Sequence, residues 1–283
     1  MTLLMLLGRL PLSARRWLGA RLGDAVRLLG ARRFVAQRNL ALAFPQMSAA
    51  QRDDILRQHF RLLGGVLLDE CALLSMEQEK LRQFVRLQGE ERLADSAPLI
   101  LLLPHFIGAS IGGLRLSLPL GGRLFFHYKP QHSRFWDAFY GRLRKRWGAV
   151  GVKADSSAMR LCARHLKQGG RFLYLPDIDP KMRKSTVFVP FLGVSQVATT
   201  SAVARLAALT GARVALCRVG QTAAGYEVCV EAPLDNFPTA ELEENTSRIN
   251  QLIGAQVTAA PAQYYWLHRR FKTRPAGEKS LYG

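Results

Sequence analysis

The chain has 283 residues, which is enough to bury a substantial core in one domain. Hydrophobic residues make up 48% and charged residues 22%, a balance typical of a folded protein rather than a disordered one. Forty Lys and Arg against 21 Asp and Glu give a net charge of +19, so we expect an anionic partner. Composition alone leaves nucleic acid, anionic lipid and an acidic protein as candidates.

The cysteines predict neither a zinc site nor a disulfide framework, because no two of them form a C-x-x-C pair. They are Cys71, Cys162, Cys217 and Cys229. We expect each to be a small buried hydrophobic residue in a reducing compartment. No metal and no cofactor is predicted.

Residues 1–46 are predicted to form an amphipathic, membrane-associating segment. Leucines and Trp17 alternate there with Arg9, Arg15, Arg16 and Arg21, a pattern typical of a helix at a lipid interface. Arg9 interrupts the apolar run too early for a bilayer span or a signal peptide. The alternative is a first helix that packs on the core. Residues 47–283 are predicted to form a single domain, since no repeat, low-complexity tract or linker interrupts them.

Helices and strands are predicted to alternate along this domain. Ser48 and Gln51 form a capping box that opens a long helix over residues 48–74. An apolar run at residues 99–103 predicts a strand buried on both faces. Further strands are predicted at residues 124–128, 172–175, 213–219 and 226–231. Further helices are predicted at 133–147, from Asp155 to Gly169, and from Thr199 or Thr200 to Gly211. The order predicts an α/β fold with a mixed, largely parallel central sheet flanked by helices.

Two strand ends carry candidate catalytic residues. His105 follows the strand at 99–103, and a histidine has the pKa of a general base near neutral pH. Asp177 and Asp179 follow the strand at 172–175. A lone His is more often structural, and an acid before Pro180 is often a turn cap, so Asp177 is the better candidate of the two acids. Both strand ends are expected at the same edge of the sheet.

Basic residues near these strand ends predict phosphate binding. Arg142 and Arg144 end the helix at 133–147, Lys129 follows the strand at 124–128, and Arg183 lies shortly after the acids. The alternative is a solvated basic face that complements the helix dipole. The C-terminal aromatic and basic residues at 263–275 fit either RNA stacking or a membrane interface, and their spacing leaves both open.

The order of these features resembles the late acyltransferases of lipid A biosynthesis, the lauroyl and myristoyl transferases of Gram-negative bacteria. The resemblance covers nearly the whole chain and is most specific in its closing motif. The matching segments are residues 38–40, 44–45, 104–106, 128–130, 141–144, 176–179, 185–191, 198–200 and 264–275.

This resemblance implies an enzyme at the cytoplasmic face of the cell inner membrane. It would transfer a fatty acyl chain from an acyl carrier protein thioester to a hydroxyl of a lipid A precursor, without a metal. His105 would be the general base, while Arg144 and Arg142 would bind phosphate or polarise the thioester carbonyl. A backbone donor near Gly108 would assist the oxyanion. Carrier protein, precursor phosphates and anionic lipids are all negative, which accounts for the net charge.

Ser110 departs from the family motif, which has Asp or Glu at this position to hold the histidine in its productive tautomer. Replacing the orienting acid of a comparable triad costs on the order of 10⁴ in rate. We predict that Asp177 takes over this role and that Ser110 is the N-cap of the following helix. Ser110 is therefore counted with His105 and Asp177 as a candidate catalytic residue.

Other functions stay open. The chain is alternatively a catalytically impaired or inactive homologue that binds lipid or carrier protein, or an acyltransferase for another glycolipid or an aminolipid. Coenzyme A is an alternative donor. A nucleic-acid partner is not predicted, because no nucleic-acid-binding motif is present.

Overall fold

The computed structural model describes residues 2–30, 32–154 and 157–283. Its helices are α1 (Thr2–Gly8), α2 (Leu12–Leu28), α3 (Arg33–Ala43), α4 (Ala49–Ala72), α5 (Gln78–Phe84), α6 (Glu91–Ala94), α7 (Ala109–Ser117), α8 (Arg134–Arg146), α9 (Ala158–Lys167), α10 (Ala202–Thr210) and α11 (Leu242–Ala259). Its strands are β1 (Val85–Gln88), β2 (Leu99–Leu102), β3 (Leu124–Tyr128), β4 (Val150–Lys153), β5 (Arg171–Tyr174), β6 (Thr186–Phe191), β7 (Val194–Thr200), β8 (Arg213–Thr222) and β9 (Gly225–Pro233). Short 3₁₀ turns lie at Leu118–Leu120 and Pro261–Gln263.

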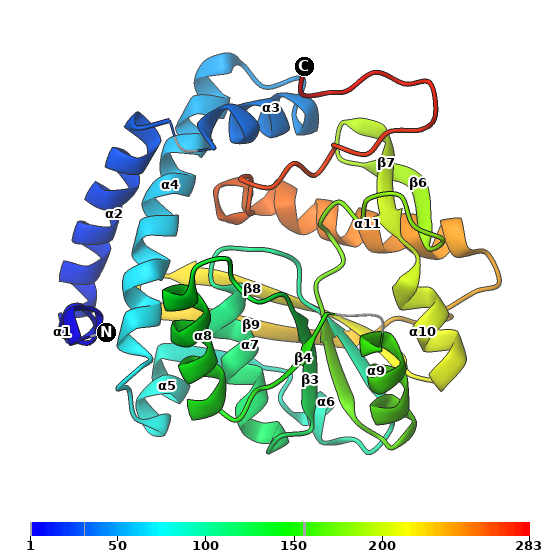
Figure 1. Cartoon of the computed structure of the whole chain (residues 1–283), viewed down its shortest axis with the longest axis horizontal. Coiled ribbons are helices and arrows are strands. Elements are labelled where there is room, and N and C mark those ends of the chain that lie inside the picture. Colours follow the sequence, from blue (N-terminus) through cyan, green and yellow to red (C-terminus); the bar gives the residue numbers. More distant parts are fainter. Residues whose placement is uncertain (1, 31, 155–156) are drawn as a thin grey trace.

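Seven strands form the central sheet in the order β1-β9-β8-β2-β5-β3-β4, with helices around it (Figure 1). Neighbours run parallel except β8 and β9, which are antiparallel. All four residues of β2 are buried, as its unbroken apolar run predicts. The expected α/β fold with a mixed, largely parallel sheet is confirmed. The antiparallel pair β6 and β7, which forms a separate small sheet, was not predicted.

Local capping signals predicted some helix starts better than others. The capping box of α4 is present: Gln51 N donates to Ser48 Oγ at 3.2 Å, and Ser48 N donates to Gln51 Oε1 at 2.8 Å. The predicted start of α10 was too early, because β7 continues through Thr200 and the helix begins after Ser201. The predicted cap Asp155 lies outside the described residues, and α9 begins at Ala158.

Helix α2 runs along α4 with its backbone in close contact (Figure 1). Glycines on both helices allow this approach. A Cβ on Gly19 would lie 2.5 Å from Gly65 Cα, and one on Gly64 would lie 2.0 Å from Gly19 O. Arg15, which sequence reasoning grouped with the interfacial arginines, is instead buried, because it donates to Asp69 Oδ1 at 2.9 Å.

The outer surface of α1, α2 and α3 exposes large apolar side chains. They are Leu3, Met5, Leu6, Trp17, Leu22, Val26, Leu28, Leu29 and Phe34. Across the described residues, no helix combines the length and the apolar character needed to cross a membrane. The free thiols of Cys71, Cys162 and Cys217 are buried as predicted, and Cys229 is half-buried.

Candidate active site

His105 and Asp177 meet at the carboxyl edge of the sheet. Leu102 of β2 pairs with Tyr174 of the parallel strand β5, so the loops that follow leave the sheet side by side. His105 Nδ1 lies 2.8 Å from Asp177 Oδ1, and the backbone N–H of His105 donates to Asp177 Oδ2 at 2.9 Å. One carboxylate therefore holds both the ring and the backbone of this histidine.

The two side chains differ in exposure and in ionisation. Asp177 is 2% exposed, whereas the side chain of His105 is 30% exposed. Burial alone would raise the pKa of Asp177, but the charge and hydrogen bonds of His105 and the charge of Arg270 hold that pKa below its usual value. An ionised Asp177 accepts the Nδ1–H of the ring, which leaves the Nε2 lone pair available as a base.

The C-terminal segment packs directly against the loop of His105. Ile107 N donates to Gln263 O at 2.7 Å, and Tyr265 N donates to His105 O at 2.8 Å. Tyr264 and Trp266 are 3% and 1% exposed. The sequence-based hypotheses of RNA stacking and of a membrane interface are therefore wrong for these two rings, because both are buried in the core.

Asp179 and the basic residues near the C-terminus have structural roles. Asp179 Oδ1 accepts from Lys181 N at 2.9 Å, as in a turn cap, and Oδ2 accepts from Thr273 N at 2.7 Å. Asp179 N donates to His268 Nε2 at 3.1 Å. Arg270 is buried and donates to Thr199 Oγ1 at 2.7 Å. The bonds of Thr273 and His268 join the C-terminal segment to the loop of Asp177, and Arg270 joins it to β7.

Ser110 is not an N-cap, because α7 begins at Ala109 and its N-cap position is occupied by Gly108. Ser110 is exposed at the start of the helix and donates its hydroxyl hydrogen to the carboxyl of Glu70. Sequence reasoning missed Glu70, which lies in α4. The sequence signal was the pair of adjacent acids Asp69 and Glu70 in the otherwise apolar last turns of that helix.

Position 108 requires a glycine, both for its backbone conformation and for the space around it. Its φ of 91° lies in the left-handed region, and a Cβ would lie 2.6 Å from the ring of Tyr226. Its backbone N–H donates to no acceptor among the described residues. The predicted role of this amide as an oxyanion donor stays a prediction.

The predicted phosphate-binding residues lie on α8, just after β3, and on the loop before β6. The guanidinium of Arg144 lies 4.2 Å from the ring centroid of Tyr128, the last residue of β3. Arg142 and Lys129 are exposed near it in sequence, while Arg183 is exposed on the loop that leads to β6. None of the four forms an ion pair with a residue that the structure describes. Their positive charges are available to a ligand.

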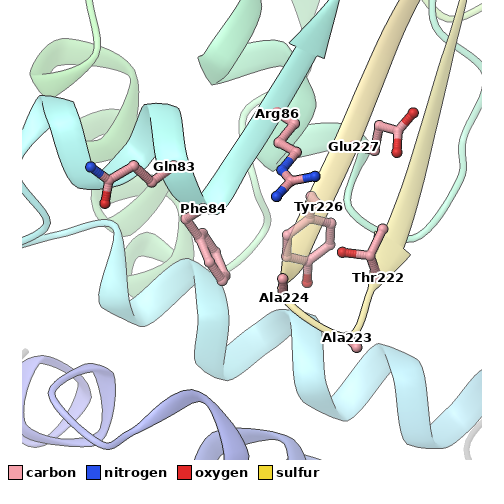
Figure 2. Close-up of a pocket in the computed structure, with 8 residues that line it drawn as sticks. All are labelled: Gln83, Phe84, Arg86, Thr222, Ala223, Ala224, Tyr226 and Glu227. Carbon is pink, nitrogen blue, oxygen red and sulfur yellow. The ribbon is translucent and has the colours of Figure 1, made fainter.

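A cavity of about 240 Å³ lies between α5, β1 and the hairpin of β8 and β9 (Figure 2). Phe84 and Tyr226 line it, together with Arg86 and Glu227. The predicted site residues do not line this cavity. The hydroxyl of Tyr226 donates to Asp69 Oδ2 at 2.9 Å, which fixes the ring between the cavity and Gly108.

Within the described residues, no three His, Cys, Asp or Glu side chains are grouped so that they could hold a metal ion. The site is a histidine paired with a buried carboxylate at the carboxyl edge of the sheet. Such a pair is the arrangement of a general base that activates a hydroxyl or thiol.

Comparison with known proteins identifies the class. Residues 1–273 match the family model of the bacterial lipid A biosynthesis acyltransferases. The chain therefore belongs to this family, and its class is that of an acyltransferase.

Three relatives by sequence agree with this assignment. The lipid A biosynthesis palmitoleoyltransferase of Escherichia coli (strain K12) is 30% identical over 97% of this chain and 90% of its own length. The lauroyltransferase of the same organism is 30% identical over 99% and 92%, and the myristoyltransferase is 27% identical over 93% and 82%. Among solved structures, the 1-acyl-sn-glycerophosphate (LPA) acyltransferase from Thermotoga maritima has a TM-score of 0.38 at 13% identity, covering 90% of this chain and 100% of its own.

Proposed function

We propose that this chain transfers a fatty acyl chain from an acyl carrier protein thioester to a hydroxyl of a lipid A precursor, with His105 as general base. The observation that carries the proposal is the contact of 2.8 Å between His105 Nδ1 and the buried Asp177. This pair supplies the oriented imidazole that Ser110 cannot hold. Membership of the lipid A acyltransferase family supports the acceptor class.

The reaction follows from the orientation of the imidazole. His105 Nε2 takes the proton of the acceptor hydroxyl while that oxygen attacks the thioester carbonyl carbon. Asp177 keeps the Nδ1–H and stabilises the imidazolium that forms. The Gly108 N–H and the charge of Arg144 stabilise the oxyanion. The intermediate then breaks its C–S bond, and the imidazolium returns the proton to the leaving thiolate, so the products are an ester and a free thiol.

The N-terminal helices form the proposed contact with the cytoplasmic face of the inner membrane. Leu28 and Leu29 are 73% and 85% exposed, and exposed Arg21 and Arg32 share their surface. Apolar side chains among cations favour an interface with anionic lipid. Binding to anionic vesicles that is weakened by Leu28→Ser and Leu29→Ser would support this contact, and binding that is unchanged would contradict it.

The direct test is transfer of a labelled acyl chain to a lipid A precursor, with acyl carrier protein and coenzyme A thioesters compared as donors. We expect transfer from the carrier protein and its loss in His105→Ala. His165→Ala is the matched control, because His165 bonds to Arg123 O at the opposite edge of the sheet, where β3 begins. Transfer that survives in His105→Ala would refute the proposed base.

The alternative of an inactive homologue rests on Ser110. A silent natural protein in which Ser110→Glu creates transfer would favour that alternative. Activity in the natural protein would show instead that Ser110 is compatible with catalysis.

A further inference from the structure

Glu70 is a buried carboxyl that the proposed reaction does not use. Only 5% of this residue is exposed. One of its oxygens accepts a hydrogen bond from the Ser110 hydroxyl, and the other accepts one from the Tyr140 hydroxyl at 3.0 Å. Ser110 belongs to α7 and Tyr140 to α8, so one carboxyl of α4 joins three helices next to the loop of His105.

The adjacent carboxyl of Asp69 has a different environment. Asp69 binds the Nε atoms of Arg15 and Arg16 at 2.9 and 3.1 Å, so its charge is neutralised and ties α2 to α4. Glu70 forms no ion pair with any residue that the structure describes. A buried carboxylate without a cationic partner lowers the stability of the folded protein. We therefore expect the function of Glu70 to involve its two hydroxyl partners, Ser110 and Tyr140.

The surroundings of Glu70 change its ionisation. Burial raises the pKa of Glu70 to about 7, against the lowering effect of the hydrogen bonds from Ser110 and Tyr140, and the charge of Asp69 adds to the rise. The titratable groups that face it are Asp69 and Cys71 from α4 and Tyr140 from α8. Both protonation states of Glu70 are accordingly populated near neutral pH.

We propose that Glu70 is a positioning residue that sets the direction of the Ser110 hydroxyl toward the lipid acceptor. This inference rests on the proposed transfer reaction. An ionised carboxylate can only accept, so Ser110 must donate to Glu70 and turn its lone pairs outward. Those lone pairs then accept from a hydroxyl or amide N–H of the lipid beside the reacting hydroxyl. A protonated Glu70 donates to Ser110 Oγ instead, so the serine hydrogen points away from Glu70 and toward the N–H or O–H donor of the lipid.

The test measures KM for a lipid A precursor between pH 6 and 8.5. In the natural protein we expect KM to fall on the order of five-fold as pH rises through 7, the effect of one net hydrogen bond. In Glu70→Gln this change should disappear. Ser110→Ala should raise KM by a similar factor at pH 8, and the double variant should behave like Ser110→Ala alone. The lipid phosphates titrate equally with all proteins, so differences between proteins report on Glu70.

Glu90→Gln is the matched control, because Glu90 also binds α7, accepting from Arg115 Nη2 at 2.8 Å. It should keep the natural dependence of KM on pH. A Glu70→Gln variant with the natural dependence, or additive effects in the double variant, would overturn this inference alone. A natural protein that transfers nothing would refute the proposed function and this inference with it. If Glu70→Gln fails to fold, the substitution of the exposed Ser110 by Ala tests the inference by itself. A KM of Ser110→Ala that equals the natural value at pH 8 would then overturn it.

Discussion

Replacing Glu70 by Gln should stabilise the protein at alkaline pH, because it removes a buried carboxyl that has no cationic partner in the part of the chain that the structure describes. Burial raises the pKa of Glu70 from the ordinary 4.5 to about 7. At about 1.4 kcal/mol per tenfold change in an ionisation constant, the ionised carboxylate costs about 3 kcal/mol in the folded state. The pKa of Glu70 is higher in the folded state than in the unfolded state, so binding of a proton to Glu70 stabilises the folded protein. This stabilisation is complete below pH 4.5 and is lost as pH rises through 7.

The assay is urea unfolding of the natural protein and of Glu70→Gln at several pH values from 4.5 to 8. The free energy of unfolding of the variant, relative to the natural protein, should rise by about 3 kcal/mol over this range. At pH 8 the corresponding gain in Tm is about 6 °C for a chain of this size. Glu243→Gln, the same atom change on the exposed first turn of α11, should change stability by no more than about 0.5 kcal/mol. A stability difference between Glu70→Gln and the natural protein that stays constant with pH, or falls as pH rises, would show that burial does not raise the pKa of Glu70.

Three further outcomes follow from the structure. Gly64→Leu should lower the free energy of unfolding in urea by about 3 kcal/mol or more, because the new side chain would meet the backbone of α2. Gly254→Ala is the control and should leave that free energy unchanged, since the nearest atom to its Cβ lies at 3.5 Å. Burial lowers the pKa of His59 to about 4. The natural protein should therefore lose up to about 3 kcal/mol of stability as pH falls from 6.5 to 4, and His59→Phe should lose less over the same pH range. Arg144→Ala should raise KM for the lipid acceptor about ten-fold, and Arg144→Lys should restore it only in part, since Lys cannot bind phosphate bidentately; an unchanged KM would remove Arg144 from the site.

The pairing of His105 with Asp177 was predictable because both positions carry strong local signals. Each follows a short apolar run that ends in a proline, and buried strands of that kind become parallel neighbours in an α/β sheet. Once the two strands are parallel and adjacent, the residues just past their ends must meet. The sequence pattern predicts parallel strands, and the parallel pairing of β2 with β5 places the site at their carboxyl ends.

The contacts that sequence reasoning missed depend on how helices pack. Glu70 reaches Ser110 because α4 lies beside α7, and no local pattern reports this. Arg15 was predicted to be exposed because an arginine in an amphipathic helix is normally solvated. It is buried because Asp69 on another helix binds it, and the local sequence around Arg15 does not report that contact. Tyr264 and Trp266 resemble surface aromatics in sequence because basic residues follow them, yet both rings are buried.

In the proposed reaction, Asp177 orients His105 as the base of acyl transfer. The most direct measurement is kcat for transfer from acyl carrier protein to a lipid A precursor in the natural protein, Asp177→Asn, His105→Ala and the double variant. We expect a loss on the order of 10⁴ in Asp177→Asn and little further loss in the double variant, because the two residues act as a unit. A kcat of Asp177→Asn within about ten-fold of the natural value would show that Asp177 does not orient His105, and so would losses of the two single variants that simply multiply in the double variant.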